Sequence, residues 1–277
     1  MERTAGAASP PAPQPVPAGA PGPVPAAETA VLLDGVPRQR GPLLALPAVA
    51  IPRAVPALRP WRLLPTPGGT PVTFFYTLLL ALTSLFAEYA GPGLLHAVYQ
   101  DSSTDVAHLS RTPVFVLLAS ALWVAGGLLS PYALAFVLVL TALERRIGGA
   151  RAILVFLAGH VLATLATEVP VGLAVLAGHL PGTSLHRLDY GISYGVAAGV
   201  GALCGLLTPW LGRPLLALVG YSLVMDLVAF QDPMTNWGHL ISLSIGTALW
   251  PVVRRWHREH GESVPADVSG SGRGAGS

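Results

Sequence analysis

Apolar residues recur in long runs from about residue 71 to about residue 253. A helix needs roughly 20 apolar residues to cross a hydrocarbon core of about 30 Å, and several runs are long enough to do so. The pattern therefore predicts an all-α polytopic membrane protein. We place six spans, at about 71–87, 130–143, 150–167, 190–207, 214–230 and 236–253.

The apolar region from Pro113 to Leu143 is too long for one straight span. It is interrupted by Gly126-Gly127 and by Ser130-Pro131, residues that commonly mark turns. We therefore divide it into a membrane-embedded or interfacial helix over 113–125 and the second span.

The two ends of the chain differ from the middle in composition. Residues 1–65 are rich in Pro, Ala and Gly, and frequent prolines prevent a regular helix or sheet. Residues 257–277 are rich in Gly and Ser. We expect a membrane domain over 66–256 between two disordered cytoplasmic tails. No basic segment leads directly into an apolar core near the N-terminus, so we expect no cleavable signal peptide.

The charged residues between the predicted spans indicate how the chain is oriented. Arginines gather before the first span, after the second, after the fourth and after the sixth, whereas the alternate loops are mostly acidic. The arginines that follow spans are Arg145, Arg146, Arg151, Arg213, Arg254, Arg255 and Arg258. Because positive loops stay in the cytoplasm, both termini are predicted to be cytoplasmic. The basic side chains are all arginine, which together with abundant Ala, Gly and Pro is typical of high-GC bacteria, so we expect a bacterial inner-membrane protein.

The overall composition excludes several classes of protein. With 52% apolar and 11% charged residues the chain lies outside the soluble class, and its net charge of +2 is too small to indicate nucleic acid as a partner. The single cysteine, Cys204, excludes a disulfide framework.

Two polar residues at the starts of predicted spans are candidates for chemistry. Ser193 lies three residues into the fourth span and His239 three residues into the sixth. At 1.5 Å per residue both lie on the order of 5 Å below the outer ends of their helices. A serine hydroxyl becomes a good nucleophile when an imidazole accepts its proton, and equal depth on separate helices is what such a pair requires.

Plainer interpretations of the same residues stay open. Gly191, Gly195 and Gly199 recur every four residues, a spacing that lets membrane helices approach closely, and Ser193 would then be one more small packing residue. His239 would be an interfacial hydrogen-bonding residue. Asp189, just before the fourth span, is expected to cap that helix or to stabilise its dipole rather than to complete a triad.

The motifs in this order resemble those of a known family. Leu143-Glu144-Arg145-Arg146-Ile147-Gly148 follows the second span, Gly191-Ile192-Ser193 opens the fourth, and Gly238-His239 opens the sixth, with Asn236 before and Gly246 after the histidine. Over about residues 72–253 this arrangement resembles the rhomboid intramembrane serine proteases, in particular the rhomboid-like proteins of high-GC bacteria. The fold class predicted is accordingly a six-transmembrane-helix rhomboid-like bundle.

The resemblance implies a function and a site. Ser193 would be the nucleophile and His239 the general base of a Ser–His dyad that cleaves transmembrane protein substrates near the outer membrane face, without a metal or an organic cofactor. The chain departs from the family pattern in four ways. Residues 128–134 contain neither the His nor the Asn of the usual oxyanion hole, Tyr194 follows the serine, Ala197 supplies no aromatic platform for the histidine, and the Trp-Arg pair typical of the first outer loop is absent. The alternative is therefore a catalytically inactive pseudoprotease that binds membrane proteins as clients.

The remaining polar residues favour structural roles. His160 and Glu168 share one face of the third span, but no tight metal-ligand spacing joins them to His179 or His186, so we expect no metal site. We expect His160 to make a buried hydrogen bond between helices. Glu144 is expected to anchor the cytoplasmic end of the second span and, as the resemblance implies, to cap the neighbouring loop. A small transporter or channel is a third alternative. It is disfavoured because the intramembrane polar residues gather at the outer ends of the spans rather than at the midplane.

Overall fold

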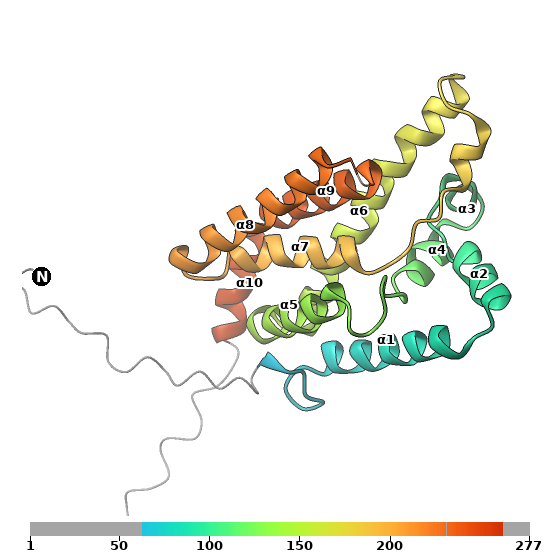
Figure 1. Cartoon of the computed structure of the whole chain (residues 1–277). Helices are drawn as coiled ribbons and strands as arrows, with labels where there is room; N and C mark the ends of the chain where they lie inside the picture. The colour runs from blue at the N-terminus through green and yellow to red at the C-terminus, as the bar shows by residue number, and fades with distance from the viewer. Residues whose placement is uncertain (1–62, 231, 263–277) are drawn as a thin grey trace, which may run out of the picture. The chain divides into compact units, whose positions relative to one another are not determined.

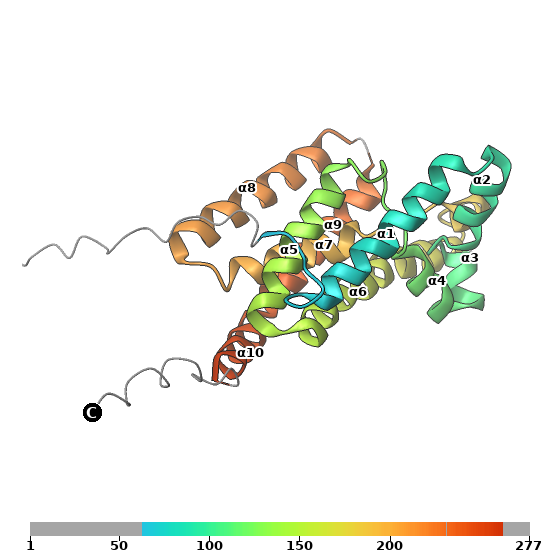
Figure 2. The same ribbon diagram turned by 90° about the horizontal axis from the view of Figure 1, so that it is seen from below.

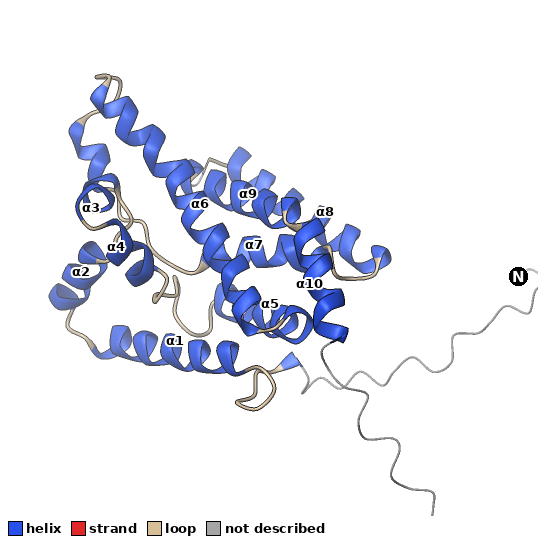
Figure 3. Ribbon diagram, turned by 180° about the vertical axis from the view of Figure 1, so that it is seen from behind, coloured by secondary structure: helices blue, strands red, loops and turns tan. Residues whose placement is uncertain are grey.

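The computed structural model describes residues 63–230 and 232–262, in which every regular element is a helix (Figure 1; Figure 3). Residues 1–62 and 263–277 of the two predicted tails lie outside this range. Residues 257–262, predicted as the start of the second tail, are the end of a helix. The helices are α1 (Pro71–Tyr89), α2 (Pro92–Asp101), α3 (Val106–Arg111), α4 (Pro113–Ser120), α5 (Pro131–Ile147), α6 (Gly149–Leu176), the 3-10 helix η2 (Gly182–His186), α7 (Ser193–Cys204), α8 (Pro209–Val228), α9 (Pro233–Ala248) and α10 (Trp250–Glu262).

Three helices of the described residues, α1, α6 and α8, are long and apolar enough to cross a membrane. The other apolar helices are shorter: α5 has 17 residues, α9 has 16 and α7 has 12. At 1.5 Å per residue, α7 is about 18 Å long, well short of a hydrocarbon core of about 30 Å. The structure thus supports a helical membrane bundle, and the count of six spans stays a prediction.

The predicted division of the apolar region 113–143 is confirmed. α4 ends at Ser120 and α5 begins at Pro131. Between them Gly126 and Gly127 have φ values of +79° and +75°, a left-handed conformation that residues with a side chain rarely adopt. The two glycines therefore lie in the non-helical segment that separates α4 from α5.

α7 is the central helix of the bundle, with α5, α6, α8 and α9 around it (Figure 1; Figure 2). Its most extensive contacts are with α9 and α6. Nearly all of its residues are buried, and small residues make this possible: Gly201 lies against the backbone at Leu243, and Gly246 lies against the backbone at Ala198. The prediction that the glycines of this segment mediate close helix packing is confirmed at Gly195, which lies against the ring of Phe156, and Gly201 packs closely in the same way.

Glu144 attaches α1 to the bundle. Its buried carboxylate accepts hydrogen bonds from the N–H groups of Val72 (3.0 Å) and Thr73 (2.7 Å) and from the Thr73 hydroxyl (2.6 Å). The first N–H groups of a helix have no intrahelical acceptor. A carboxylate there accepts hydrogen bonds from them, and its negative charge is stabilised by the positive end of the helix dipole. The expected capping role of Glu144 is confirmed, but Glu144 caps the first turn of α1 rather than a loop.

Candidate active site

Ser193 is the first residue of α7 and is half-buried. The segment before it is fixed by backbone hydrogen bonds from Gly191 N–H to the Ser120 carbonyl (3.0 Å) and from Ile192 N–H to the Trp123 carbonyl (3.2 Å). Gly191 has a φ of +125°, which a side chain would strain. The glycine thus lets the chain turn from the loop after η2 directly into α7, with the serine at the turn.

His239 lies in α9 and is 4% exposed. Its imidazole stacks on the ring of Tyr132 from α5, with ring centroids 5.9 Å apart and an interplanar angle of 24°. The ring of Tyr194 meets it edge to face, at 5.3 Å and 77°. The expectation that the histidine has no aromatic platform is therefore wrong, because two tyrosines outside the expected position supply one.

The contact with Tyr194 places the first turn of α7 against α9. The two helices can approach at this level because Gly238 leaves room for the ring of Tyr194. The hydroxyl of Ser242, one turn further along α9, donates a hydrogen bond to the carbonyl of Tyr194.

Within the described residues, neither ring nitrogen of His239 has a hydrogen-bond partner. No hydrogen bond therefore joins Ser193 to His239 in this conformation. The other interpretation of His239, as an interfacial hydrogen-bonding residue, finds no partner among the described protein atoms.

The start of α5 and the start of α7 differ in which polar groups remain unpaired within their own helix. At the start of α5 the Ser130 hydroxyl is occupied as a helix cap, accepting from Ala133 N–H at 3.2 Å. The first intrahelical bond of α7 runs from Val196 N–H to the Ile192 carbonyl (3.0 Å). The N–H groups of residues 193–195 precede this bond, and as first-turn donors they have no acceptor within the helix.

The family model described as rhomboid-like protein matches residues 68–259. The chain belongs to the rhomboid-like family. The searches of curated proteins and of solved structures gave no match. The match covers α1 to most of α10 and so includes both Ser193 and His239.

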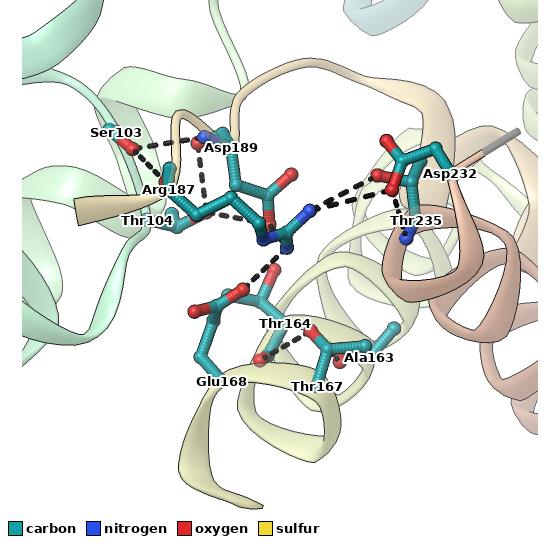
Figure 4. Close-up of polar contacts among 10 residues, drawn as sticks. All are labelled: Ser103, Thr104, Ala163, Thr164, Thr167, Glu168, Arg187, Asp189, Asp232 and Thr235. Carbon is teal, nitrogen blue, oxygen red and sulfur yellow. Dashed lines mark hydrogen bonds and ion pairs between the residues drawn. The ribbon is translucent and has the colours of Figure 1, made fainter. Parts of the chain in front are cut away.

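A charged network lies at the same end of this rhomboid-like bundle (Figure 4). The guanidinium of Arg187 donates a hydrogen bond to Glu168 of α6 (2.6 Å) and forms an ion pair with Asp189 (3.5 Å). It also reaches the start of α9, where it lies 3.4 Å from the Thr235 hydroxyl and 3.8 Å from Asp232. Sequence reasoning missed this role, although Arg187 is one of only two arginines in the loops predicted to be outside.

The expectation that Asp189 caps the fourth span is wrong. The residue at the N-cap of α7 is Ile192, which makes no side-chain cap. The carboxylate of Asp189 instead accepts from the Thr104 hydroxyl (3.3 Å), while its backbone carbonyl accepts from Thr104 N–H (2.8 Å). Because the turn at Gly191 lies between Asp189 and the start of α7, Asp189 is three residues before the N-cap position.

Burial and charge act in opposite directions in this network. Burial raises the pKa of Asp189 above its usual range, and the neighbouring guanidinium of Arg187 offsets only part of that rise. For Arg187, burial acts to lower the pKa, but the carboxylates of Asp189 and Glu168 outweigh it and raise the pKa overall. Arg187 is therefore the positively charged partner of the buried side chains of Glu168 and Asp189.

His160 and Glu168, the two polar residues of α6 singled out in the sequence, have protein partners. The Nε2 atom of His160 lies 3.0 Å from the Ser120 hydroxyl and 3.1 Å from the Leu117 carbonyl, so the expected hydrogen bond between buried helices, here α6 and α4, is confirmed. Glu168 bonds to Arg187. No group of three or more metal-ligating side chains occurs in residues 63–230 and 232–262.

Proposed function

We propose that this rhomboid-like protein is an intramembrane serine endopeptidase of a bacterial inner membrane, with six spans and both termini in the cytoplasm. It would cleave membrane-anchored protein substrates near the outer face of the membrane. The observation that carries the proposal is the environment of His239: a buried imidazole between Tyr132 and Tyr194, with no competing partner for either nitrogen, beside the turn that carries Ser193.

In the proposed reaction the hydroxyl oxygen of Ser193 attacks the scissile carbonyl carbon while His239 accepts the hydroxyl proton. The first-turn N–H groups of α7 stabilise the resulting oxyanion, because they carry the positive end of the helix dipole. His239 then gives the proton to the leaving amine, and water hydrolyses the acyl-enzyme. Catalytic hydrogen bonds are often long in the free enzyme and tighten on substrate binding, so we expect Ser193 and His239 to approach each other in the complex.

A second candidate is a pseudoprotease that binds membrane proteins without cutting them. Two observations favour it: the missing Ser193–His239 hydrogen bond, and the absence of a His or Asn side chain at the start of α5, where Ser130 serves as a helix cap. It shares the fold with the first candidate and differs only in whether the serine reacts.

Labelling with a fluorophosphonate probe separates the two candidates. In detergent micelles we expect the wild-type protein to be labelled at Ser193, and Ser193→Ala to abolish the labelling. His239→Ala should slow it at least about 100-fold, because general-base catalysis typically contributes that much. Ser244→Ala is the matched control, since this serine is exposed on α9 and its hydroxyl bonds only to the Leu240 carbonyl.

Either of two results would contradict the protease proposal. Labelling that persists in Ser193→Ala would mean that another residue reacts. No labelling of the wild type, together with no cleavage of a panel of single-span model substrates, would favour the pseudoprotease.

A further inference from the structure

Arg187 connects four separate segments of the chain. Its side chain joins Glu168 of α6, Asp189 of the segment before α7, and Asp232 and Thr235 at the start of α9. Its backbone carbonyl accepts a hydrogen bond from the Ser103 hydroxyl (3.3 Å), which ties the loop to the segment between α2 and α3. The side chain is 27% exposed and that of Glu168 only 1%, so most of these contacts are shielded from solvent.

Two of these segments carry the candidate catalytic residues. Asp189 lies four residues before Ser193, and the backbone between them is held by the bonds of Gly191 and Ile192. On α9, Thr235 lies one turn before His239 and on the same face. Any shift of the start of α9 relative to the segment before α7 therefore moves His239 relative to Ser193.

The rest of the contact between α7 and α9 lies on the inner side of the site. The Ser242 hydroxyl bonds to the Tyr194 carbonyl, and Gly246 lies against Ala198. Towards the outer end, beyond His239, the hydrogen bonds and ion pairs that join α9 to the segment before α7 within residues 63–230 and 232–262 are those of Arg187. A planar guanidinium is suited to this task because its fork of donors bonds several acceptors in fixed directions, which a single ammonium group does not.

We propose that Arg187 is a positioning residue that fixes the outer end of α9 against the segment leading into α7, and so sets the approach of His239 to Ser193. The effect of Arg187 on the approach of His239 to Ser193 rests on the proposed function. The structural part of the inference, the fixed distance between the two segments, is independent of whether the protein is an enzyme.

The test combines probe kinetics with a distance measurement on the full chain in micelles. The variants are Arg187→Gln, Arg187→Lys and the control Arg111→Gln, which changes the exposed arginine at the end of α3. Spin labels at Leu188 and Trp237, both exposed and replaced by cysteine in a Cys204→Ala background, report the separation of the loop and α9.

We expect Arg187→Gln to broaden the distance distribution and to lower the maximal labelling rate at Ser193 by about tenfold or more, since small misplacements of catalytic groups have effects of that size. The probe concentration at half-maximal rate should stay unchanged. Arg187→Lys keeps the charge that Glu168 and Asp189 need, so it should keep the melting temperature near that of the wild type while labelling stays slow. Arg111→Gln should match the wild type in all three measurements.

Three results would overturn the proposal: an unchanged distance distribution in Arg187→Gln, a broadened distribution with unchanged labelling, or full activity in Arg187→Lys. If the wild type is neither labelled nor cleaves any of the model substrates, the protease proposal fails by itself. The distance distributions then still decide whether Arg187 holds the two segments together.

Discussion

At the scale of single residues, the position of Tyr194 is central to the site. Its ring meets His239, its carbonyl accepts from Ser242, and it is 3% exposed. The ring fits because residue 238 is a glycine. The small residue beside the histidine therefore contributes to the site through the tyrosine that it accommodates.

We predict that Gly238→Ala destabilises the protein by about 1–3 kcal/mol, the usual effect of overpacking a well-packed interior, because the added methyl group meets the ring of Tyr194. Labelling of Ser193 should fall as the ring displaces His239. Unfolding in mixed micelles and probe labelling measure the two effects. The control is Gly93→Ala in α2, where a methyl group meets nothing and the change should stay within about 1 kcal/mol. Equal behaviour of the two variants would contradict the prediction.

At the scale of elements, α1 is held by polar contacts with α5 and with the segment after α4. Glu144 accepts three hydrogen bonds from the first turn of α1, two of them shorter than 2.8 Å. Further along, the Tyr76 hydroxyl donates to the Ala121 carbonyl (2.7 Å) and the Thr83 hydroxyl to the Leu122 carbonyl (2.7 Å). These contacts hold an otherwise largely exposed helix in place, and Glu144 is the one that carries a charge.

We predict that Glu144→Ala lowers the free energy of unfolding by about 3 kcal/mol, because hydrogen bonds to a charged acceptor are worth about 1.5–3 kcal/mol and the freed N–H groups remain buried. Glu88→Ala, at an exposed carboxylate near the other end of α1, should change it by less than about 0.5 kcal/mol. Denaturant titration followed by circular dichroism measures both values. A loss at Glu144 no larger than at Glu88 would show that the cap is not needed.

At the scale of the whole molecule, the helices that are long enough to span a membrane also expose many apolar side chains. They are numerous on α1, α6 and α8, the three helices long enough to cross a bilayer. On α8, Leu218 is 66% exposed and Val228 71% exposed, and the helix contacts mainly α9 and α7. Such surfaces are stable when lipid covers them, which agrees with a protein embedded in a membrane.

We predict that both ends of the described bundle face the cytoplasm, as the arginines after the predicted spans require. In a Cys204→Ala background, Arg258→Cys in α10 should react with a membrane-impermeant maleimide only after the cells are lysed. Leu180→Cys, in the loop after α6, should react in intact cells, and both positions are exposed in the fold. If Arg258→Cys reacted in intact cells and Leu180→Cys only after lysis, the orientation would be opposite to the predicted one.

Much of the helical layout could be predicted from the sequence, because each helix leaves local signals. Pro71, Pro113, Pro131, Pro209 and Pro233 are the first residues of their helices, a position that proline favours. Helix ends were less predictable. α6 continues through Pro170 to Leu176, beyond the predicted end near Thr167, and α7 begins at Ser193 rather than at Tyr190.

The sequence by itself determined that the chain forms a helical membrane protein of the rhomboid-like type, and it singled out Ser193 and His239, because run length, charge bias and short motifs are local properties. The tertiary structure alone decided what surrounds them. Tyr132 comes from another helix to form the platform for His239, and Arg187 gathers carboxylates from three segments. The periodicity of one helix shows which face is buried, but not which side chain of another helix lies opposite, and that is set only when the helices pack.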